Sequence, residues 1–142
     1  MINTEWTAAE VKAWAESQKQ LRNYSTVIER IKALSDRFKI NQYGALSHNP
    51  ERYPLFHITS PNWDSAKKSV LITGGVHGYE PSGIDAPLEF LETATPELLK
   101  EFNLAIFPCI SPWGYEYDHR WDINAEDPNR GFRENNPRAE VE

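Results

Sequence analysis

Two side chains that could bind a metal, His77 and Glu80, stand three positions apart in the sequence. They follow the apolar run 70–73 and the pair Gly74-Gly75. An imidazole nitrogen and a carboxylate oxygen both bind zinc at about 2.0–2.2 Å, and glycines give a tight turn the freedom to aim both groups at one point. An exposed histidine beside a helix-capping glutamate produces the same H-x-x-E spacing, so this pair alone leaves both interpretations open.

A second polar segment, residues 114–132, follows the apolar run 104–110 and contains Arg120, Asn129 and Arg130. Near a metal, an arginine can stabilise the negative charge that develops on a carbonyl oxygen. The forked guanidinium can also bind a carboxylate through two parallel hydrogen bonds. A solvated loop with aromatic anchors would have the same composition. The segment by itself does not distinguish a substrate site from such a loop.

The elements that must position these segments include three predicted helices. A capping-box pattern at the N-terminus predicts a helix over about residues 7–22. Apolar residues at helical spacing predict a second helix that ends near Lys39 and a third over residues 81–93. Pro87 must kink this third helix or lie in its first turn.

Short apolar or alternating runs predict the strands of a sheet. They cover residues 40–46, 53–59, 70–73 and 104–110. The alternation of helices and strands favours a largely parallel sheet covered on both faces. The predicted fold class is therefore α/β, as a three-layer α/β/α arrangement with a mostly parallel mixed sheet. Ligands bind such sheets at the carboxyl ends of the strands, where both polar segments begin.

The composition is that of an ordinary globular chain, with 39% apolar and 25% charged residues among 142. The formal charge of −6, without a Lys/Arg run, disfavours nucleic acid as a partner. No signal-like segment or apolar run of about 18 residues occurs, so we expect no membrane partner and a cytoplasmic location, or a mature chain whose signal was removed. The single Cys109 lies in an apolar run and is expected to be buried.

Taken together, the two polar segments resemble the zinc metallocarboxypeptidase family. In that family a strand ends in H-x-x-E, and a later segment has the pattern R-x-N-x-N-G-x-D-x-N-R. Here Arg120 stands nine residues before Asn129, and Asn124 and Asp127 also match the pattern. The segment 111–117 looks like the N-P-D-G-Y-E-Y that often precedes it. The resemblance covers roughly residues 24–142.

The resemblance implies a role for each residue of the two motifs. His77 and Glu80 would be ligands of a Zn2+ cofactor. Arg120 would polarise the scissile carbonyl and stabilise its oxyanion. Asn129 and Arg130 would bind the terminal carboxylate of the substrate. The implied reaction is zinc-dependent hydrolysis of a C-terminal peptide bond, or of a related amide bond, by metal-activated water.

The resemblance also implies how the chain is organised. Residues 1–23 would be an N-terminal helical extension, and residues 24–142 would be the N-terminal part of a carboxypeptidase-like catalytic domain. The family's third zinc ligand is a histidine and its general base a glutamate, both downstream of the Asn-Arg pair. Only 12 residues follow Arg130, and none is a histidine. Among the histidines present, His119 is a weak candidate for a substitute ligand, and the remaining ones are weaker still.

The last residues of the sequence resemble the start of a helix, because Asn136-Pro137 is followed by acidic residues. We therefore expect a fold that is incomplete at its C-terminus, with the third ligand and the general base beyond residue 142. The isolated chain is expected to bind zinc weakly and to have negligible turnover.

Three positions depart from the family pattern and leave other functions open. Asp122 and Ala125 stand where the pattern has Asn and Gly, and Gly131 stands where the family continues the Asn-Arg pair with a second Asn, as N-R-N-F. The run 77–83 also resembles the succinylglutamate desuccinylase and aspartoacylase-like branch, which would imply a small N-acyl amino acid as substrate. In that branch the arginine usually stands closer to the Asn-Arg pair, so the spacing favours a peptidase. A further alternative is an inactive domain that binds carboxylates.

The expected partner is a peptide or small amide with a free carboxylate, and the sequence indicates neither side-chain preference nor oligomeric state.

Overall fold

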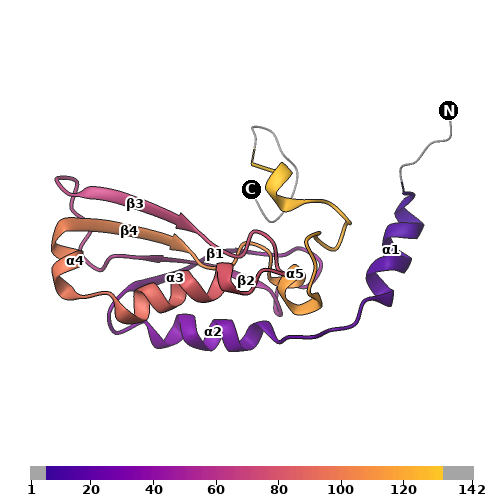
Figure 1. Ribbon diagram of the computed structural model, residues 1–142, viewed down its shortest axis with the longest axis horizontal. Helices are drawn as coiled ribbons and strands as arrows, with labels where there is room; N and C mark the ends of the chain where they lie inside the picture. Colours follow the sequence, from indigo (N-terminus) through magenta and orange to yellow (C-terminus); the bar gives the residue numbers. More distant parts are fainter. Residues whose placement is uncertain (1–5, 133–142) are drawn as a thin grey trace.

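The computed structural model describes residues 6–132 and contains a four-stranded sheet with helices packed against it (Figure 1). Within this range no helix combines the length and the apolar character needed to cross a lipid bilayer. The helices are α1 (Ala8–Ser17), α2 (Tyr24–Ala33), α3 (Ser82–Thr93), α4 (Pro96–Glu101), α5 (Pro112–Tyr117) and the short 3₁₀ helix η1 (Pro128–Arg130). The strands are β1 (Lys39–Ala45), β2 (Pro54–Thr59), β3 (Lys68–Thr73) and β4 (Phe102–Phe107).

The sheet has the strand order β1-β2-β4-β3. β3 and β4 run parallel, and the crossover between them contains α3 and α4. The predicted α/β class with a mixed sheet is confirmed. However, β2 is antiparallel to both of its neighbours, so the described part of the sheet is less parallel than expected. The reason for the first antiparallel pair is that the loop 46–53 is too short for a parallel crossover.

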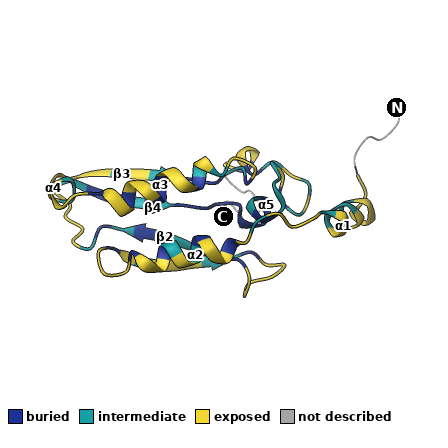
Figure 2. Ribbon diagram, turned by 60° about the horizontal axis from the view of Figure 1, so that its bottom comes forward, coloured by how far each residue is buried: buried dark blue, intermediate teal, exposed yellow. Residues whose placement is uncertain are grey.

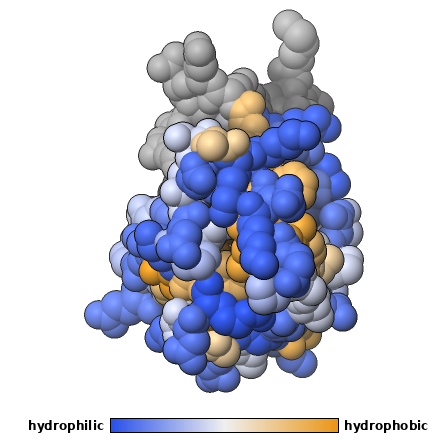
Figure 3. All heavy atoms as spheres, turned by 90° about the vertical axis from the view of Figure 1, so that its left-hand side faces the viewer, coloured by the Kyte–Doolittle hydropathy of each residue, from blue (hydrophilic) through white to orange (hydrophobic). Residues whose placement is uncertain are grey.

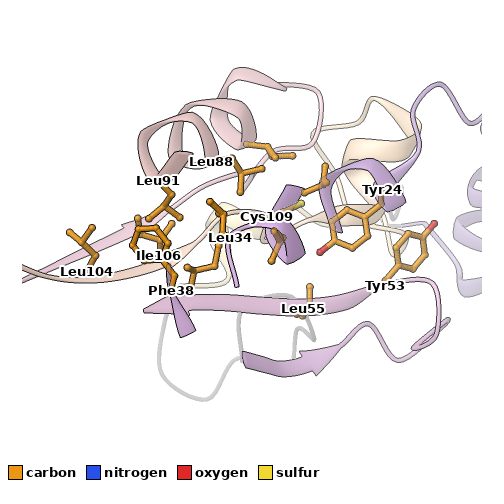
Figure 4. Packing of buried hydrophobic residues seen from close by; sticks show 14 of the residues in the cluster. Tyr24, Leu34, Phe38, Tyr53, Leu55, Leu88, Leu91, Leu104, Ile106 and Cys109 are labelled. Carbon is orange, nitrogen blue, oxygen red and sulfur yellow. The ribbon is translucent and has the colours of Figure 1, made fainter. Parts of the chain in front are cut away.

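The hydrophobic core lies between one face of the sheet and the helices α2 and α3, whose inward sides are buried (Figure 2). Leu34, just after α2, lies in one cluster with Leu88 and Leu91 of α3 and with Leu104 and Ile106 of β4 (Figure 4). All five side chains are buried. Burying each such side chain contributes about 1.5–3 kcal/mol, so this cluster fixes both helices on the same face.

The opposite face of the sheet carries a different set of side chains. Leu71, which alternates with the core-facing residues of β3, is 67% exposed. On the same face, the Phe107 ring lies 5.2 Å from the Tyr43 ring and 5.5 Å from the His57 ring, measured between centroids. Residues 6–132 therefore form one helical layer against the sheet, and the second layer of the predicted three-layer arrangement is not formed by this part of the chain.

Several helices differ from the sequence-based expectation. α1 ends at Ser17 rather than near residue 22, because Gln18 is extended and its side chain donates to the Trp14 carbonyl at 2.7 Å. α2 ends at Ala33 rather than near residue 39, although the turns that follow still bury Phe38. α4 and α5 were not predicted, because each has only six residues and too few positions to show helical periodicity. The predicted start of a helix at residue 136 lies outside the described residues.

Candidate metal and substrate site

The turn that carries His77 leaves the sheet at the carboxyl end of β3. The Gly74 N–H continues the parallel pairing by donating to the Phe107 carbonyl at 2.7 Å. The Gly75 carbonyl accepts the Ser111 N–H at 2.9 Å, and Gly75 itself has a φ of 59°, a conformation that favours glycine. The loops after β3 and β4 are therefore joined by backbone hydrogen bonds. Both polar segments start at the same edge of the sheet.

A proline inside α3 contributes to the conformation of this turn. Pro87 has no N–H, so it cannot bond the Gly83 carbonyl four residues earlier. The Gly75 N–H donates to that carbonyl at 3.1 Å instead. A Cβ on Gly74 would lie 2.3 Å from the Gly83 oxygen, so no larger residue fits there without a shift. Pro87, which was expected to kink the helix or lie in its first turn, thus leaves the Gly83 carbonyl available to accept the Gly75 N–H. This hydrogen bond holds the turn after β3 against α3.

The same turn packs directly against α5. A Cβ on Gly78 would lie 1.8 Å from the Gly114 carbonyl carbon and 1.9 Å from the Tyr115 nitrogen. The next N–H, that of Tyr79, donates to the His119 carbonyl at 3.1 Å. The H-x-x-E backbone is therefore in contact with the segment that leads to Arg120, and side chains of the two segments can meet.

The side chains of His77 and Glu80 are in direct contact. Nδ1 of His77 lies 3.4 Å from Oε1 of Glu80. Two ligands of a tetrahedral zinc ion, each about 2.0–2.2 Å from the metal, lie about 3.3–3.6 Å apart, so this separation fits zinc. In residues 6–132 there is no group of three or more His, Cys, Asp or Glu side chains that could hold a metal. Among the described residues, this site therefore brings together two side chains that could bind zinc, whereas a hydrolytic zinc site uses three protein ligands.

Asp127 connects the two polar segments. Its Oδ1 lies 3.0 Å from Nε2 of His77, and its Oδ2 accepts hydrogen bonds from Nη2 and Nε of Arg120 at 3.0 and 3.2 Å. Both ring nitrogens of His77 therefore lie within hydrogen-bonding distance of a carboxylate, Nε2 beside Asp127 and Nδ1 beside Glu80. Asp127 matches the family pattern in sequence, but that match alone indicated no role for it.

The pKa of Asp127 reflects these contacts. Burial raises it, but the hydrogen bonds from His77, Arg120 and the Asn129 N–H outweigh burial and hold the pKa below its ordinary value. The carboxylate is therefore charged at neutral pH. It accepts from the histidine and balances the charge of the arginine.

Asn129 and Arg130 lie in η1, directly after this carboxylate. The Asn129 N–H donates to Oδ1 of Asp127 at 3.0 Å, so Asp127 also caps η1. Nε of Arg130 lies 3.8 Å from Oδ2 of Asp127, and the Arg130 side chain is 73% exposed. The two residues predicted to bind a carboxylate are thus tied to Arg120 through Asp127, and both are open to solvent.

Residues 121–126 form a loop that departs from the family pattern in sequence. The buried Asp122 carboxylate accepts the N–H groups of Asn124 and Glu126 at 2.9 and 2.8 Å. Burial raises the pKa of Asp122 above its ordinary value, and these hydrogen bonds offset only part of the effect. Ala125, where the pattern has glycine, has a φ of 60°. The loop is compact and is held by an acid that is costly to bury.

A second buried acid, Glu116, ties α5 to the rest of the fold. Its carboxylate accepts from the Tyr24 N–H at 2.7 Å, from Nε of Arg52 at 2.8 Å and from the Tyr53 hydroxyl at 2.8 Å. Its backbone carbonyl accepts N–H groups from the loop before α2. These bonds fix the element that leads to Arg120. The only sequence signal for this residue was its place in the 111–117 motif.

Known proteins share both the sequence pattern and the fold. The sequence model of the family described as zinc carboxypeptidase matches residues 7–140, a range that includes α1. A solved structure from Shewanella amazonensis, of a protein assigned as a metallopeptidase, is 32% identical with a TM-score of 0.65, and the match covers 84% of this chain and 44% of that one. A similarly assigned structure from Shewanella denitrificans is 31% identical with a TM-score of 0.64, covering 78% and 40%.

Curated sequences agree with these structures. Carboxypeptidase 2 of Trichophyton rubrum is 28% identical over a region that covers 63% of this chain and 19% of that protein. The chain therefore spans less than half the length of the relatives it matches. Both motifs lie at one edge of a sheet that these structures share, and the family match covers nearly the whole sequence. The chain belongs to the zinc carboxypeptidase family.

Proposed function

We propose that this protein is a zinc-dependent carboxypeptidase that hydrolyses the last peptide bond of a peptide, or a related amide bond. The observation that supports this most directly is the 3.4 Å separation of the His77 and Glu80 donor atoms. A second supporting observation is that His77 and Arg120 both contact the carboxylate of Asp127. Since the chain spans less than half the length of its relatives, the activity is proposed for the whole protein.

In this proposal His77 and Glu80 hold the zinc ion. With zinc on Nδ1, Nε2 of His77 would carry the ring proton and donate it to the carboxylate of Asp127, which would fix the orientation of the ring. When bound, zinc would supply a Lewis acid and lower the pKa of a water molecule toward 7. The Glu80 side chain is 52% exposed, so the solvent reaches this side of the pair.

Arg120 would stabilise the negative charge that develops on the scissile carbonyl oxygen. Hydrogen bonds to Asp127 and to Tyr79 raise the pKa of Arg120 above its ordinary value, so the guanidinium stays charged. The two bonds to Asp127 orient it before a substrate arrives. A charge already in position needs no reorganisation during the reaction, which is the basis of oxyanion stabilisation. A guanidinium also has further N–H donors that these bonds do not use.

Arg130 and Asn129 would bind the terminal carboxylate of the peptide. The exposed guanidinium of Arg130 can meet a carboxylate with two parallel hydrogen bonds, a geometry that lysine cannot offer. The cap by Asp127 sets the start of η1 and so the position of both residues relative to Arg120. Binding the terminus there would place the last peptide bond beside Arg120.

The test measures the zinc content of the whole protein and its hydrolysis of N-acylated peptides with free C-termini. His77→Ala is expected to remove most of the bound zinc and to abolish hydrolysis. His57→Ala, on the other face of the sheet, is the matched control and should change neither. Unchanged zinc content and turnover in His77→Ala would refute the proposal.

Two further substrates define the reaction. A peptide with an amidated C-terminus should be hydrolysed much more slowly than its free acid, because Arg130 then has no carboxylate to bind. Equal rates would contradict the proposed role of Arg130. Faster turnover of a small N-acyl amino acid than of any peptide would favour the amidohydrolase alternative.

A further inference from the structure

An aromatic pocket lies next to the proposed site, between α1 and the loop that follows Arg120. It has a volume of about 360 Å³ and is lined by Trp6, Trp14, Trp121 and Ala125. A wider crevice of about 640 Å³ also has Trp6 in its lining, together with residues of α1 such as Val11 and Lys12 and residues of the loop 123–126 such as Asn124. The two hollows are therefore neighbours, and the wider one has both apolar and charged residues in its lining.

Two of the tryptophans that line the pocket are unusually accessible to solvent. Trp6 is 55% exposed and Trp121 is 46% exposed. Grouped apolar rings on a surface mark a binding site more often than a single exposed ring does. The end of the molecule around α4 is different, since hydrophilic side chains cover most of it and apolar ones occupy small areas between them (Figure 3).

The inner wall of the pocket is fixed before any ligand binds. The ring of Trp14 lies 5.6 Å from the Trp113 ring and 5.3 Å from the His119 ring, measured between centroids. His119 in turn stacks on Trp113, and its Nε2 lies 2.7 Å from Oε1 of Gln18 at the end of α1. These contacts hold α1 against α5. A preformed wall lowers the entropy lost when a ligand binds.

The pocket is also connected to the proposed catalytic residues. Trp121 directly follows Arg120, and the loop that carries it is closed at its base by the Arg120–Asp127 bonds. η1, with Arg130, lies on one side of this loop, and α1 lies on the other (Figure 1). A peptide whose terminus is held by Arg130 would therefore extend past Arg120 toward α1.

We propose that the pocket binds an apolar side chain, preferably an aromatic one, from a substrate residue upstream of the scissile bond. The nearly apolar lining of the pocket selects the class of side chain, and the polar groups in the neighbouring crevice, such as Asn124, could hydrogen-bond the peptide backbone beside it. This assignment rests on the proposed carboxypeptidase function, because it uses the position of the carboxylate at Arg130. The binding of an aromatic group can nevertheless be measured without catalysis.

The first experiment uses the signals of the indole N–H groups in a two-dimensional NMR spectrum, to which the five tryptophans of the chain contribute. The probe is N-acetyl-phenylalaninamide, which has no free carboxylate for Arg130, and N-acetyl-alaninamide is the control ligand. The signals of Trp6, Trp14 and Trp121 should shift with the first probe only. The signal of Trp63, which is 50% exposed but lies outside the pocket, should stay in place.

Variants of the pocket and a matched control give the affinity. Trp121→Ala and Trp6→Ala should each weaken binding of the probe at least about tenfold, the loss expected when one of a few apolar contacts is removed. Trp63→Ala should bind as the unchanged protein does. No shift of the three pocket signals at about 10 mM probe would overturn the proposal, since that corresponds to negligible affinity. The proposal would also be overturned if the three pocket signals shifted with protein concentration in the absence of the probe, because that would indicate self-association.

The second experiment uses the whole protein and peptides that carry Phe or Gly upstream of the scissile bond. The ratio of kcat/KM for the Phe peptide to that for the Gly peptide should fall about tenfold in Trp121→Ala, because the KM of the Phe peptide rises. The zinc content should not change. An unchanged preference would overturn the proposal. If no peptide is hydrolysed at all, the proposed function fails, whereas the indole signals still decide whether the pocket binds an aromatic group.

Discussion

Nε2 of His77 lies 3.0 Å from Oδ1 of Asp127, although the two residues are 50 positions apart in the sequence. The same carboxylate accepts from Arg120 and from the N–H of Asn129. One acidic side chain therefore orients the candidate metal ligand and the candidate oxyanion-stabilising arginine, and it also caps η1. Its removal should affect metal binding more than it affects the fold, because the core cluster lies elsewhere.

Asp127→Asn should weaken zinc binding roughly 10–100-fold, the range observed when the partner of a metal-bound histidine is mutated, because the amide has no negative charge and its NH2 group would face the Arg120 guanidinium. The amide can still accept at the cap of η1, so the metal-free protein should remain folded. A competition titration against a chromophoric chelator measures the affinity. Asp36→Asn, an exposed turn residue, is the control and should bind zinc normally. Equal affinities in the two variants would contradict the role of Asp127.

Asp122→Asn should increase the free energy of unfolding at about pH 7. The folded-state pKa of Asp122 is raised by burial, so its contribution to stability falls as pH rises from the unfolded value of about 3.9 through the folded value. Asparagine avoids the buried charge, and its side-chain oxygen can accept the same two N–H groups.

The stabilising effect of Asp122→Asn should disappear below about pH 3.5, where the acid is protonated in both the folded and unfolded states. Urea denaturation at several pH values measures this dependence, with Asp36→Asn again as the control. A variant that is less stable than the unchanged protein at neutral pH would show that the charged carboxylate is needed to hold the loop.

Glu116→Gln should reduce the free energy of unfolding by about 1–3 kcal/mol. Three donors would then face a weaker or wrongly oriented acceptor. They are the Tyr24 N–H, the Arg52 guanidinium and the Tyr53 hydroxyl. Chemical denaturation measures the change. Glu89→Gln on the exposed side of α3 is the matched control, for which we expect a change within about 0.5 kcal/mol. A similarly small change in Glu116→Gln would show that this network does not stabilise the fold.

Gly78→Ala should disrupt the contact between the metal-binding turn and α5, because the new Cβ would overlap backbone atoms of Gly114 and Tyr115. Neither backbone can move without displacing Tyr79 or His119, so we expect a loss of several kcal/mol or failure to fold. Gly44→Ala is the matched control, since a Cβ at that position would have no neighbouring atom within 4 Å. Thermal unfolding followed by circular dichroism compares the two, and similar melting temperatures would be inconsistent with the close approach at Gly78.

Local patterns in the sequence determined the family, the α/β class and the main elements of this protein. The inward faces of α2 and α3 follow from apolar residues at helical spacing, which depend only on the geometry of a single helix. The candidate site residues followed from two short motifs whose order and spacing are specific in combination. Each of these features is encoded within a few neighbouring residues.

Other features were decided only by the tertiary structure. The antiparallel pairing of β2 with β4, the support of Gly75 by the Gly83 carbonyl and the pairing of His77 with Asp127 all join residues that are not neighbours in sequence. The aromatic pocket likewise forms only because the contacts of α1 with Trp113 and His119 place it opposite the loop after Arg120. Such contacts depend on how whole elements pack together, and no local periodicity or spacing encodes them. The sequence therefore specified which residues could do the chemistry, and the packing of the elements decided which of them meet.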